Sequence, residues 1–116
     1  MNFFSATVRD GTATLADGTT MKLPGLADRG SVIIGLRPES MLPAADGAPG
    51  LVATVALVEP LGSDTLVHFR VADTGYVARV PPEPRPRVGD QLTLAIDPAR
   101  AHLFDPQTGA AIGAGG

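Results

Sequence analysis

The stretch VRDGTATLADGTTMKL (residues 8–23) contains two Asp-Gly pairs, Asp10-Gly11 and Asp17-Gly18, each set between runs rich in Thr, Val and Leu. An Asp-Gly pair accepts the left-handed backbone of a two-residue hairpin turn and is the strongest short-range signal for a β-hairpin. We therefore predict a meander of three short strands, at 6–9, 12–15 and 19–23. Short strands joined by tight turns are typical of all-β proteins and not of helical bundles.

Further strand-like runs follow this meander. The run 31–36 is apolar on both faces, which indicates a buried strand. In the run 65–71 the side chains alternate, so that Val67, Phe69 and Val71 share one face. Before residue 100, the additional strands are predicted at 31–36, 51–57, 65–71, 76–80 and 91–96.

Two segments are predicted to be loops. Residues 41–50 are polar and rich in Gly and Pro, and PPEPRPRVGD (81–90) cannot be a central strand because proline has no N–H to donate to a ladder. Asp97 as N-cap and Pro98 at the first helical position predict one helical turn, and 102–112 are expected to supply a turn and a last strand. The whole pattern predicts a small OB-like β-barrel of about eight short strands with one short helical turn.

The composition limits the classes of function. With 116 residues the chain is expected to form a single domain, 1–116, with one modest core. It has no cysteine, which excludes disulfides and thiolate chemistry. Nine basic residues against twelve acidic ones give a net charge of −3, which argues against nucleic acid or an anionic membrane surface as a partner. No run reaches the length of a transmembrane helix, so a soluble intracellular protein is expected.

Residues that could support catalysis are sparse and poorly placed. None of the serines lies in a Gly-x-Ser-x-Gly motif, and Lys22, the only lysine, does not follow a phosphate-binding glycine loop. His68 lies on the polar face of a predicted strand and His102 follows the predicted helical turn, and no spacing between them recommends a metal site. Glu39 and Glu59 adjoin prolines at predicted strand ends, so turn and ion-pair roles are expected for them. The sequence predicts no enzymatic site.

Several segments, taken in chain order, resemble one family. They are MNFF (1–4), LADG (15–18), IGLRPESM (34–41), VEPLGSDTLV (58–67), VGD (88–90) and HLFDPQTG (102–109). Together they resemble the C-terminal regulatory domain of ATP-binding subunits of bacterial ABC importers for sugars and glycerol 3-phosphate, of the maltose-importer type. That domain is an OB-like transport-associated (TOBE) module. This chain departs from the family pattern at Ser40, where such domains often carry His, and at Pro60, which interrupts the Val-Glu-x-Leu-Gly run.

The resemblance implies a non-catalytic regulatory and dimerisation domain, excised from a longer ATPase subunit, that supports ATP-driven uptake of sugars or related solutes. The implied partners are the nucleotide-binding domain of the same chain, a second copy in a homodimer, permease subunits reached through the parent, and a regulatory protein; nucleic acid is not expected. ATP and Mg would belong to the missing nucleotide-binding domain, so no cofactor is expected in this fragment. The implied location is cytoplasmic, at the inner face of the cell membrane.

The resemblance also implies a set of residues for interdomain or regulatory contacts. They are Arg37, Pro38, Glu39, Glu59, Leu61, Gly62, His102, Phe104 and Asp105. The strand 51–58 and the turn 59–66 are expected near the dimer contact, since a two-fold contact uses one surface patch twice. An oxyanion- or small-ligand-binding module is the alternative, ranked second because lysine is nearly absent and Ser31, Ser40 and Ser63 lie in unrelated contexts.

Overall fold

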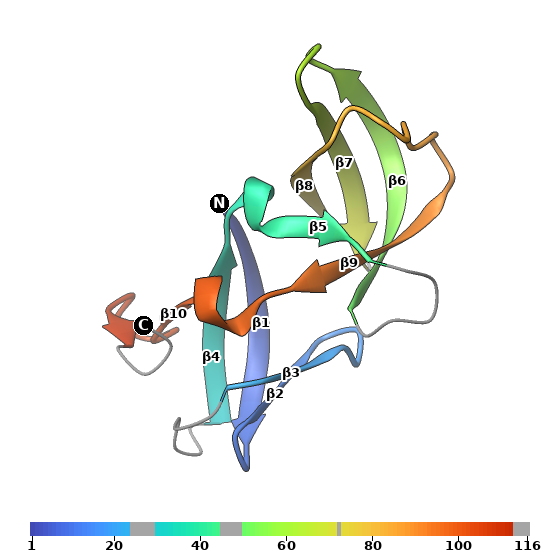
Figure 1. Cartoon of the computed structure of the whole chain (residues 1–116). Helices are drawn as coiled ribbons and strands as arrows, with labels where there is room; N and C mark the ends of the chain where they lie inside the picture. Colours follow the sequence, from blue (N-terminus) through green and yellow to red (C-terminus); the bar gives the residue numbers. More distant parts are fainter. Residues whose placement is uncertain (24–29, 45–49, 72, 113–116) are drawn as a thin grey trace. The chain divides into compact units, whose positions relative to one another are not determined.

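The computed structural model describes residues 1–23, 30–44, 50–71 and 73–112 (Figure 1). The chain divides into two compact units, one made of Met1–Leu36 with Asp97–Gly116 and the other of Arg37–Ile96. Regular structure in the described residues consists of eleven β-strands and two 3-10 turns, with one antiparallel sheet in each unit. The prediction of an all-β, OB-like fold is confirmed. No helical segment in this described part has the length and apolar character needed to span a membrane.

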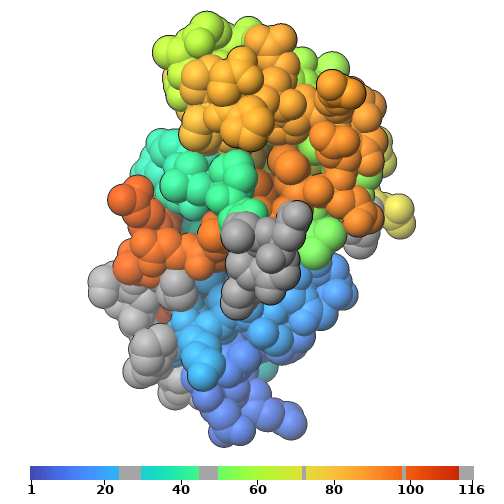
Figure 2. Space-filling view, turned by 45° about the vertical axis from the view of Figure 1, so that its right-hand side comes forward, coloured from blue at the N-terminus to red at the C-terminus, as the bar shows by residue number. Residues whose placement is uncertain are grey.

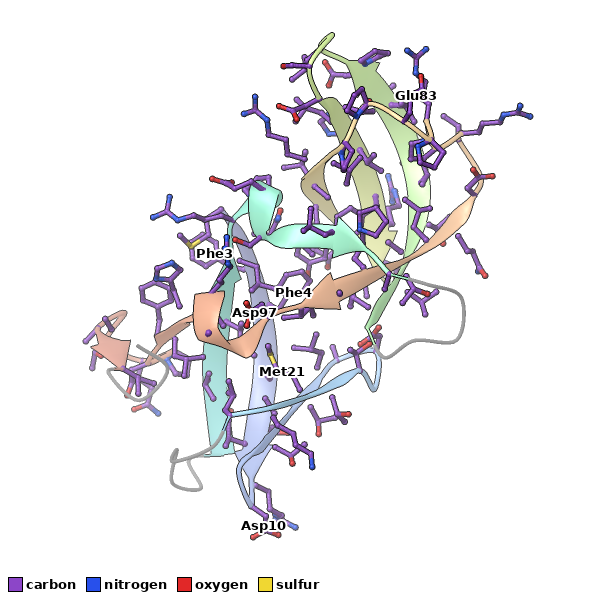
Figure 3. The ribbon with its side chains drawn as sticks, viewed as in Figure 1. Phe3, Phe4, Asp10, Met21, Glu83 and Asp97 are labelled. Atoms are coloured by element: carbon purple, nitrogen blue, oxygen red, sulfur yellow. The ribbon has the colours of Figure 1, made fainter. Side chains whose placement is uncertain are left out.

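The first unit is a six-stranded sheet. Its strands are β1 (Asn2–Arg9), β2 (Thr12–Leu15), β3 (Thr20–Lys22), β4 (Gly30–Leu36), β10 (His102–Phe104) and β11 (Ala111–Ile112), in the order β11-β10-β4-β1-β2-β3. The turn predicted at Asp10-Gly11 is confirmed, because these two residues have φ values of 52° and 72° and join β1 to β2. Asp10 lies at the tip of this hairpin (Figure 3).

Side chains alternate strictly along β1. Phe4 and Val8 are buried, together with Ile34 of the neighbouring β4, and form part of the core of this unit. Phe3 and Thr7 are exposed on the opposite side of the sheet, called here the outer face of the first unit. Phe3 and Phe4 therefore project to opposite sides of the strand (Figure 3).

The second unit is a five-stranded sheet with long, curved central strands (Figure 1). Its strands are β5 (Met41–Pro43), β6 (Leu51–Pro60), β7 (Thr65–Val71), β8 (Thr74–Val80) and β9 (Gln91–Ile96), in the order β5-β9-β6-β7-β8. The edge strands β5 and β8 contact each other, so the sheet curls into a half-barrel. Leu51, Phe69 and Leu94 are almost completely buried within it. On β9, Leu94 is buried and Leu92 and Ile96 are half-buried.

A β-bulge at Ala56 reverses the facing of the second half of β6. Val55 pairs with Phe69, and the next pair along the ladder is Leu57 with His68. Simple alternation would place Leu57 on the core side with Val55. The extra residue turns the Leu57 side chain outward instead, and this side chain is 50% exposed.

The prediction of a loop over 41–50 is wrong at its start. Met41–Pro43 form β5, which pairs with β9 through Met41–Ile96 and Pro43–Leu94. A proline is tolerated in this strand because β5 is an edge strand and has a ladder on one side only. Residues 45–49 of the predicted loop lie outside the described residues.

Two strands extend beyond their predicted bounds by three residues or more. β1 begins at Asn2 and not at residue 6, because its first residues already pair with the end of β4. β6 continues to Pro60, which pairs with Thr65, so the turn between β6 and β7 narrows to residues 61–64. In both places the strand end is set by pairing with a neighbouring strand, and the local sequence does not show which residues will pair.

The structure contains two short helical turns where one was predicted, and each begins at a proline. The predicted turn is η2 (Pro98–Arg100), and Asp97 Oδ1 accepts a hydrogen bond from the Ala99 N–H at 3.0 Å, as expected of an N-cap. The additional turn is η1 (Pro38–Ser40), which connects β4 to β5. Proline fixes the backbone angle that starts such a turn.

Candidate contact surfaces

Arg37, Pro38 and Glu39 form a fixed corner at the start of the second unit. Arg37 is extended (φ −73°, ψ 146°), as expected before a proline. The Ser40 N–H donates to the Arg37 carbonyl at 2.9 Å, and the Met41 N–H donates to the Pro38 carbonyl. Arg37 and Glu39 are exposed and form no ion pair with another described residue, so the ion pair expected for Glu39 is absent from this part of the chain.

Leu61 and Gly62 lie in the tight turn between β6 and β7. The Leu61 N–H donates to the Asp64 carbonyl at 2.8 Å, and Gly62 has a φ of 91°, which favours glycine. Asp64 also accepts a hydrogen bond from Arg79 Nε of β8 at 2.9 Å. The turn is therefore tied to the neighbouring strand, while the Leu61 side chain remains 49% exposed.

Glu59 lies on the sheet surface beside this turn, on the side facing away from the core. The register places Leu57, His68 and Val77 in one cross-strand row. The adjacent row on the same face holds Glu59, Leu66 and Arg79. These six residues are called here the outer face of β6–β8.

A charged pair crosses this outer face. His68 Nε2 lies 2.5 Å from Glu59 Oε1, which gives Glu59 the ion-pair role that the sequence predicted, provided that the imidazole is protonated. Arg79 and Asp64 form a second pair at the same end of the sheet. Leu57 thus sits on a surface where apolar side chains are interspersed with opposite charges, a composition found at protein–protein contacts.

His102 and Phe104 lie on β10 of the first unit. His102 pairs with Gly35 of β4 and is exposed, and the Phe104 ring meets the Phe3 ring edge-on, with ring centroids 6.0 Å apart. Met1, Phe3, His102 and Phe104 together are called here the aromatic patch. Met1 and Phe3 are 47% and 55% exposed. Exposed large apolar side chains gathered on one face are the kind of surface that proteins use for contacts.

Gly35 forms the floor of the aromatic patch. A Cβ built on this residue would lie 2.6 Å from Met1 Sδ, 3.1 Å from Phe104 Cε2 and 3.4 Å from Phe3 Cε1. The three side chains therefore close over the backbone of β4 only because position 35 has no side chain.

Asp105 organises the turn between β10 and β11. Its Oδ1 accepts hydrogen bonds from the N–H groups of Gln107 at 2.8 Å and Thr108 at 3.2 Å. Its backbone N–H donates to Ala110, and the Gly109 N–H donates to its carbonyl. This network gives Asp105 a clear role in holding the turn.

A hollow of about 440 Å³, within the usual range for ligand sites, lies beside the proline-rich segment 81–86 in the second unit. Its apolar wall includes Leu42, Val80 and Leu92, and its charged residues are Glu83, Arg85 and Asp90. Figure 2 shows the amber proline-rich segment next to the green-cyan residues of β5. Because both signs of charge line this hollow, it does not select a ligand of one charge.

The structure groups the predicted residues into separate sets. Within the second unit, Glu59, Leu61 and Gly62 lie at one end of β6, and Arg37 directly precedes η1, which contains Pro38 and Glu39. Within the first unit, His102, Phe104 and Asp105 follow one another on β10 and its turn.

The sequence did not reveal Leu57 as a surface residue, because a strand pattern carries no signal for the bulge. The Phe3–Phe104 contact was missed because only the pairing of β1 and β10 with β4 brings the two together.

A family profile described as the TOBE domain matches residues 34–104 of this chain. The chain belongs to the TOBE domain family. A second profile, described as the MalK OB fold domain, matches residues 1–41. The TOBE assignment confirms the family that the sequence segments indicated.

This TOBE-family chain is similar to ATP-binding proteins of transporters. It is 40% identical over 116 residues to the sulfoquinovosyl glycerol transport ATP-binding protein of Agrobacterium fabrum, covering 93% of the chain and 32% of the relative. It is 39% identical over 111 residues to the sn-glycerol-3-phosphate import ATP-binding protein of Ruegeria pomeroyi, covering 94% and 31%. It is 33% identical over 126 residues to the multiple sugar-binding transport ATP-binding protein of Streptococcus mutans, covering 97% and 33%. The chain thus spans no more than 33% of the length of these curated relatives.

Proposed function

We propose that this chain is the non-catalytic regulatory and dimerisation domain of the ATP-binding subunit of an ABC importer for sugars or related solutes such as glycerol 3-phosphate. Its membership of the TOBE family and its similarity to transport ATP-binding proteins support the parent assignment. The partners in this proposal are the nucleotide-binding domain of the same subunit, a second copy and, through the parent, permease subunits. ATP and Mg are bound by the nucleotide-binding domain, and the subunit works on the cytoplasmic side of the membrane.

The side-chain hydrogen bonds of the described residues support a non-catalytic role. Asp17, Asp90, Asp97 and Asp105 each accept a backbone N–H within three residues along the chain, which is how Asp fixes turns. His68 contacts the carboxylate of Glu59 across two strands. These interactions order the backbone and the sheet surface, and none of them activates a nucleophile.

The observation that carries the dimerisation proposal is the outer face of β6–β8. Leu57 is exposed there because of the bulge, and Leu61 is exposed at the adjoining turn. A two-fold contact places the same patch of each copy against the other, so the Leu57 side chains of both copies would be buried in the dimer. The surrounding Glu59–His68 and Arg79–Asp64 pairs supply a polar rim around that centre.

The regulatory half of the proposal uses the two remaining groups of residues. Arg37 and Glu39 present charges that form no ion pair with another described residue, on a rigid corner that suits a contact with the nucleotide-binding domain. The aromatic patch presents exposed apolar surface that suits a regulatory protein. Neither group shares a residue with the outer face of β6–β8.

Sedimentation equilibrium at high protein concentration tests the dimerisation proposal, with Leu57→Asp as the variant and the parent subunit measured alongside. A buried carboxylate at the dimer centre should shift the equilibrium strongly toward monomer. Val88→Asp is the matched control, since Val88 is 65% exposed in the same unit but lies in the proline-rich loop. The proposal is abandoned if the chain is strictly monomeric and Leu57→Asp leaves assembly of the parent subunit unchanged.

A further inference from the structure

We propose that a shallow hollow on the outer face of the first unit binds a neutral polyhydroxylated ligand, such as a glycerol or hexose moiety. The hollow has a volume of about 410 Å³, within the usual range for ligand sites. Four of the residues that line it carry a side-chain hydroxyl group, namely Ser5, Thr7, Thr14 and Ser31. This site shares no residue with the proposed dimer contact and does not depend on it.

The strand register aligns the four hydroxyls. Thr7 of β1 lies directly opposite Thr14 of β2 on one side and Ser31 of β4 on the other. Directly opposite residues have Cβ atoms about 5 Å apart, so the three side chains form a row across three strands. Ser5 lies two residues from Thr7 on the same strand and therefore on the same face. The row and the neighbouring Ser5 make a compact two-dimensional array.

These hydroxyls are available to a ligand. All four residues are exposed, and no hydrogen bond joins their side chains to another described residue. Each hydroxyl can donate one hydrogen bond and accept two, which is the same capacity that each sugar hydroxyl has. An array of donor–acceptor groups therefore matches a ligand that carries several hydroxyls of its own.

The remaining lining residues select a neutral ligand with an apolar side. Ile33 of β4 and Pro106 of the β10–β11 turn add apolar surface beside the hydroxyls. Ile33 is the cross-strand neighbour of both Ser5 and Phe104. The C–H groups of a sugar ring can rest on such a wall while its hydroxyls face the array. None of the described residues that line the hollow has a charged side chain, so these residues offer an oxyanion no counter-charge.

Titration of the ¹⁵N-labelled chain, followed by two-dimensional NMR, tests this proposal with glycerol, glucose and sodium sulfate as probes. We expect saturable shifts with glucose, centred on residues 5, 7, 14 and 31, at millimolar affinity. Thr7→Val keeps the size and strand preference of the side chain but removes the central hydroxyl, so binding should weaken roughly fivefold, the usual cost of one neutral hydrogen bond.

Thr12→Val is the matched control, because Thr12 lies on the same face of β2 as Thr14 but outside the hollow. The affinity of the Thr12→Val variant for glucose should stay unchanged, and its spectrum should differ only at residues near position 12. Saturable shifts with sulfate and not with glucose would contradict the proposal of a neutral ligand and indicate an anion site instead. Absence of saturable shifts with all three probes, or equal weakening by both variants, would show an ordinary solvated sheet surface and overturn the proposal.

Discussion

The rings of Phe3 and Phe104 meet edge-on, with centroids 6.0 Å apart and planes inclined at 65°, although they come from opposite ends of the chain. Edge-to-face geometry is favourable for aromatic pairs because the positive ring edge faces the negative ring face. β4 lies between the strands that carry the two rings, and its Gly35 leaves the space beneath them. The aromatic patch thus depends on one glycine.

Gly35→Val is expected to destabilise the chain by about 1–3 kcal/mol, because its side chain would overlap Met1, Phe3 and Phe104. Urea unfolding measures the loss, and near-ultraviolet circular dichroism reports the displaced phenylalanines. Gly75→Val is the matched control: Gly75 also lies in a strand, and a Cβ there meets nothing within 4 Å. Equal effects of the two substitutions would contradict the role assigned to Gly35.

Thr65→Val is expected to stabilise the chain by about 1 kcal/mol, since it replaces a buried hydroxyl that has no partner by a methyl group of similar size. Thr65 is 1% exposed, and its Oγ1 has no hydrogen-bond partner among the described residues. Thermal unfolding gives the change. Thr65→Ser keeps the hydroxyl and removes the methyl, so it should lower the unfolding temperature; a rise with Ser and a fall with Val would contradict this account.

Asp105→Ala is expected to cost about 1 kcal/mol of unfolding free energy, because it removes the acceptor for two backbone N–H groups of the β10–β11 turn. Asp105→Asn should restore most of that loss, since the amide oxygen can accept the same two hydrogen bonds. Urea unfolding of the three chains provides the comparison. If the Ala variant unfolds like the unmodified chain but a partner protein no longer binds, Asp105 acts through contacts and not through the turn.

The Glu59–His68 pair is expected to contribute less than about 1 kcal/mol to stability, because both side chains are well exposed, at 49% and 39%. A double-mutant cycle with Glu59→Gln and His68→Gln isolates the coupling. The same substitutions should have a larger effect on dimer dissociation if the pair forms a rim that becomes dehydrated on association. A coupling energy that is large in the monomer and unchanged by association would argue against placing this pair at the rim of the dimer contact.

Much of the fold could be predicted where local chemistry decides it. Asp10-Gly11 adopts the positive backbone angles that its residue types allow, and the hairpin follows. Asp97 caps η2 as its position before a proline indicates. The alternation of Val67, Phe69 and Val71 corresponds to a strand face that is buried in the structure. Each of these features depends on residues that are close together in the chain.

The candidate contact surfaces were harder to predict, because distant strands assemble them. Neighbouring phenylalanines at positions 3 and 4 look alike in the sequence, and only the pairing of β1 with β4 decides which one is buried. The Gly- and Pro-rich composition of residues 41–50 predicts a loop, and β5 forms there because it pairs with β9, which lies far along the chain. The hydroxyl array has the same origin, since Thr14 and Ser31 meet only through Thr7.

The bulge at Ala56 has a consequence for how this surface can change in related sequences. Each side chain on a strand faces one of the two sides of the sheet. One bulge residue therefore reverses whether the odd-numbered or the even-numbered residues after it face the core. Deleting Ala56 would make the ladder regular and leave Leu57 opposite His68 and Glu59 opposite Leu66, so both would still face outward. If Ala56 instead entered the ladder and paired with His68, Leu57 would lie opposite the buried Val67 and face inward, and Val58 and Pro60 would face outward.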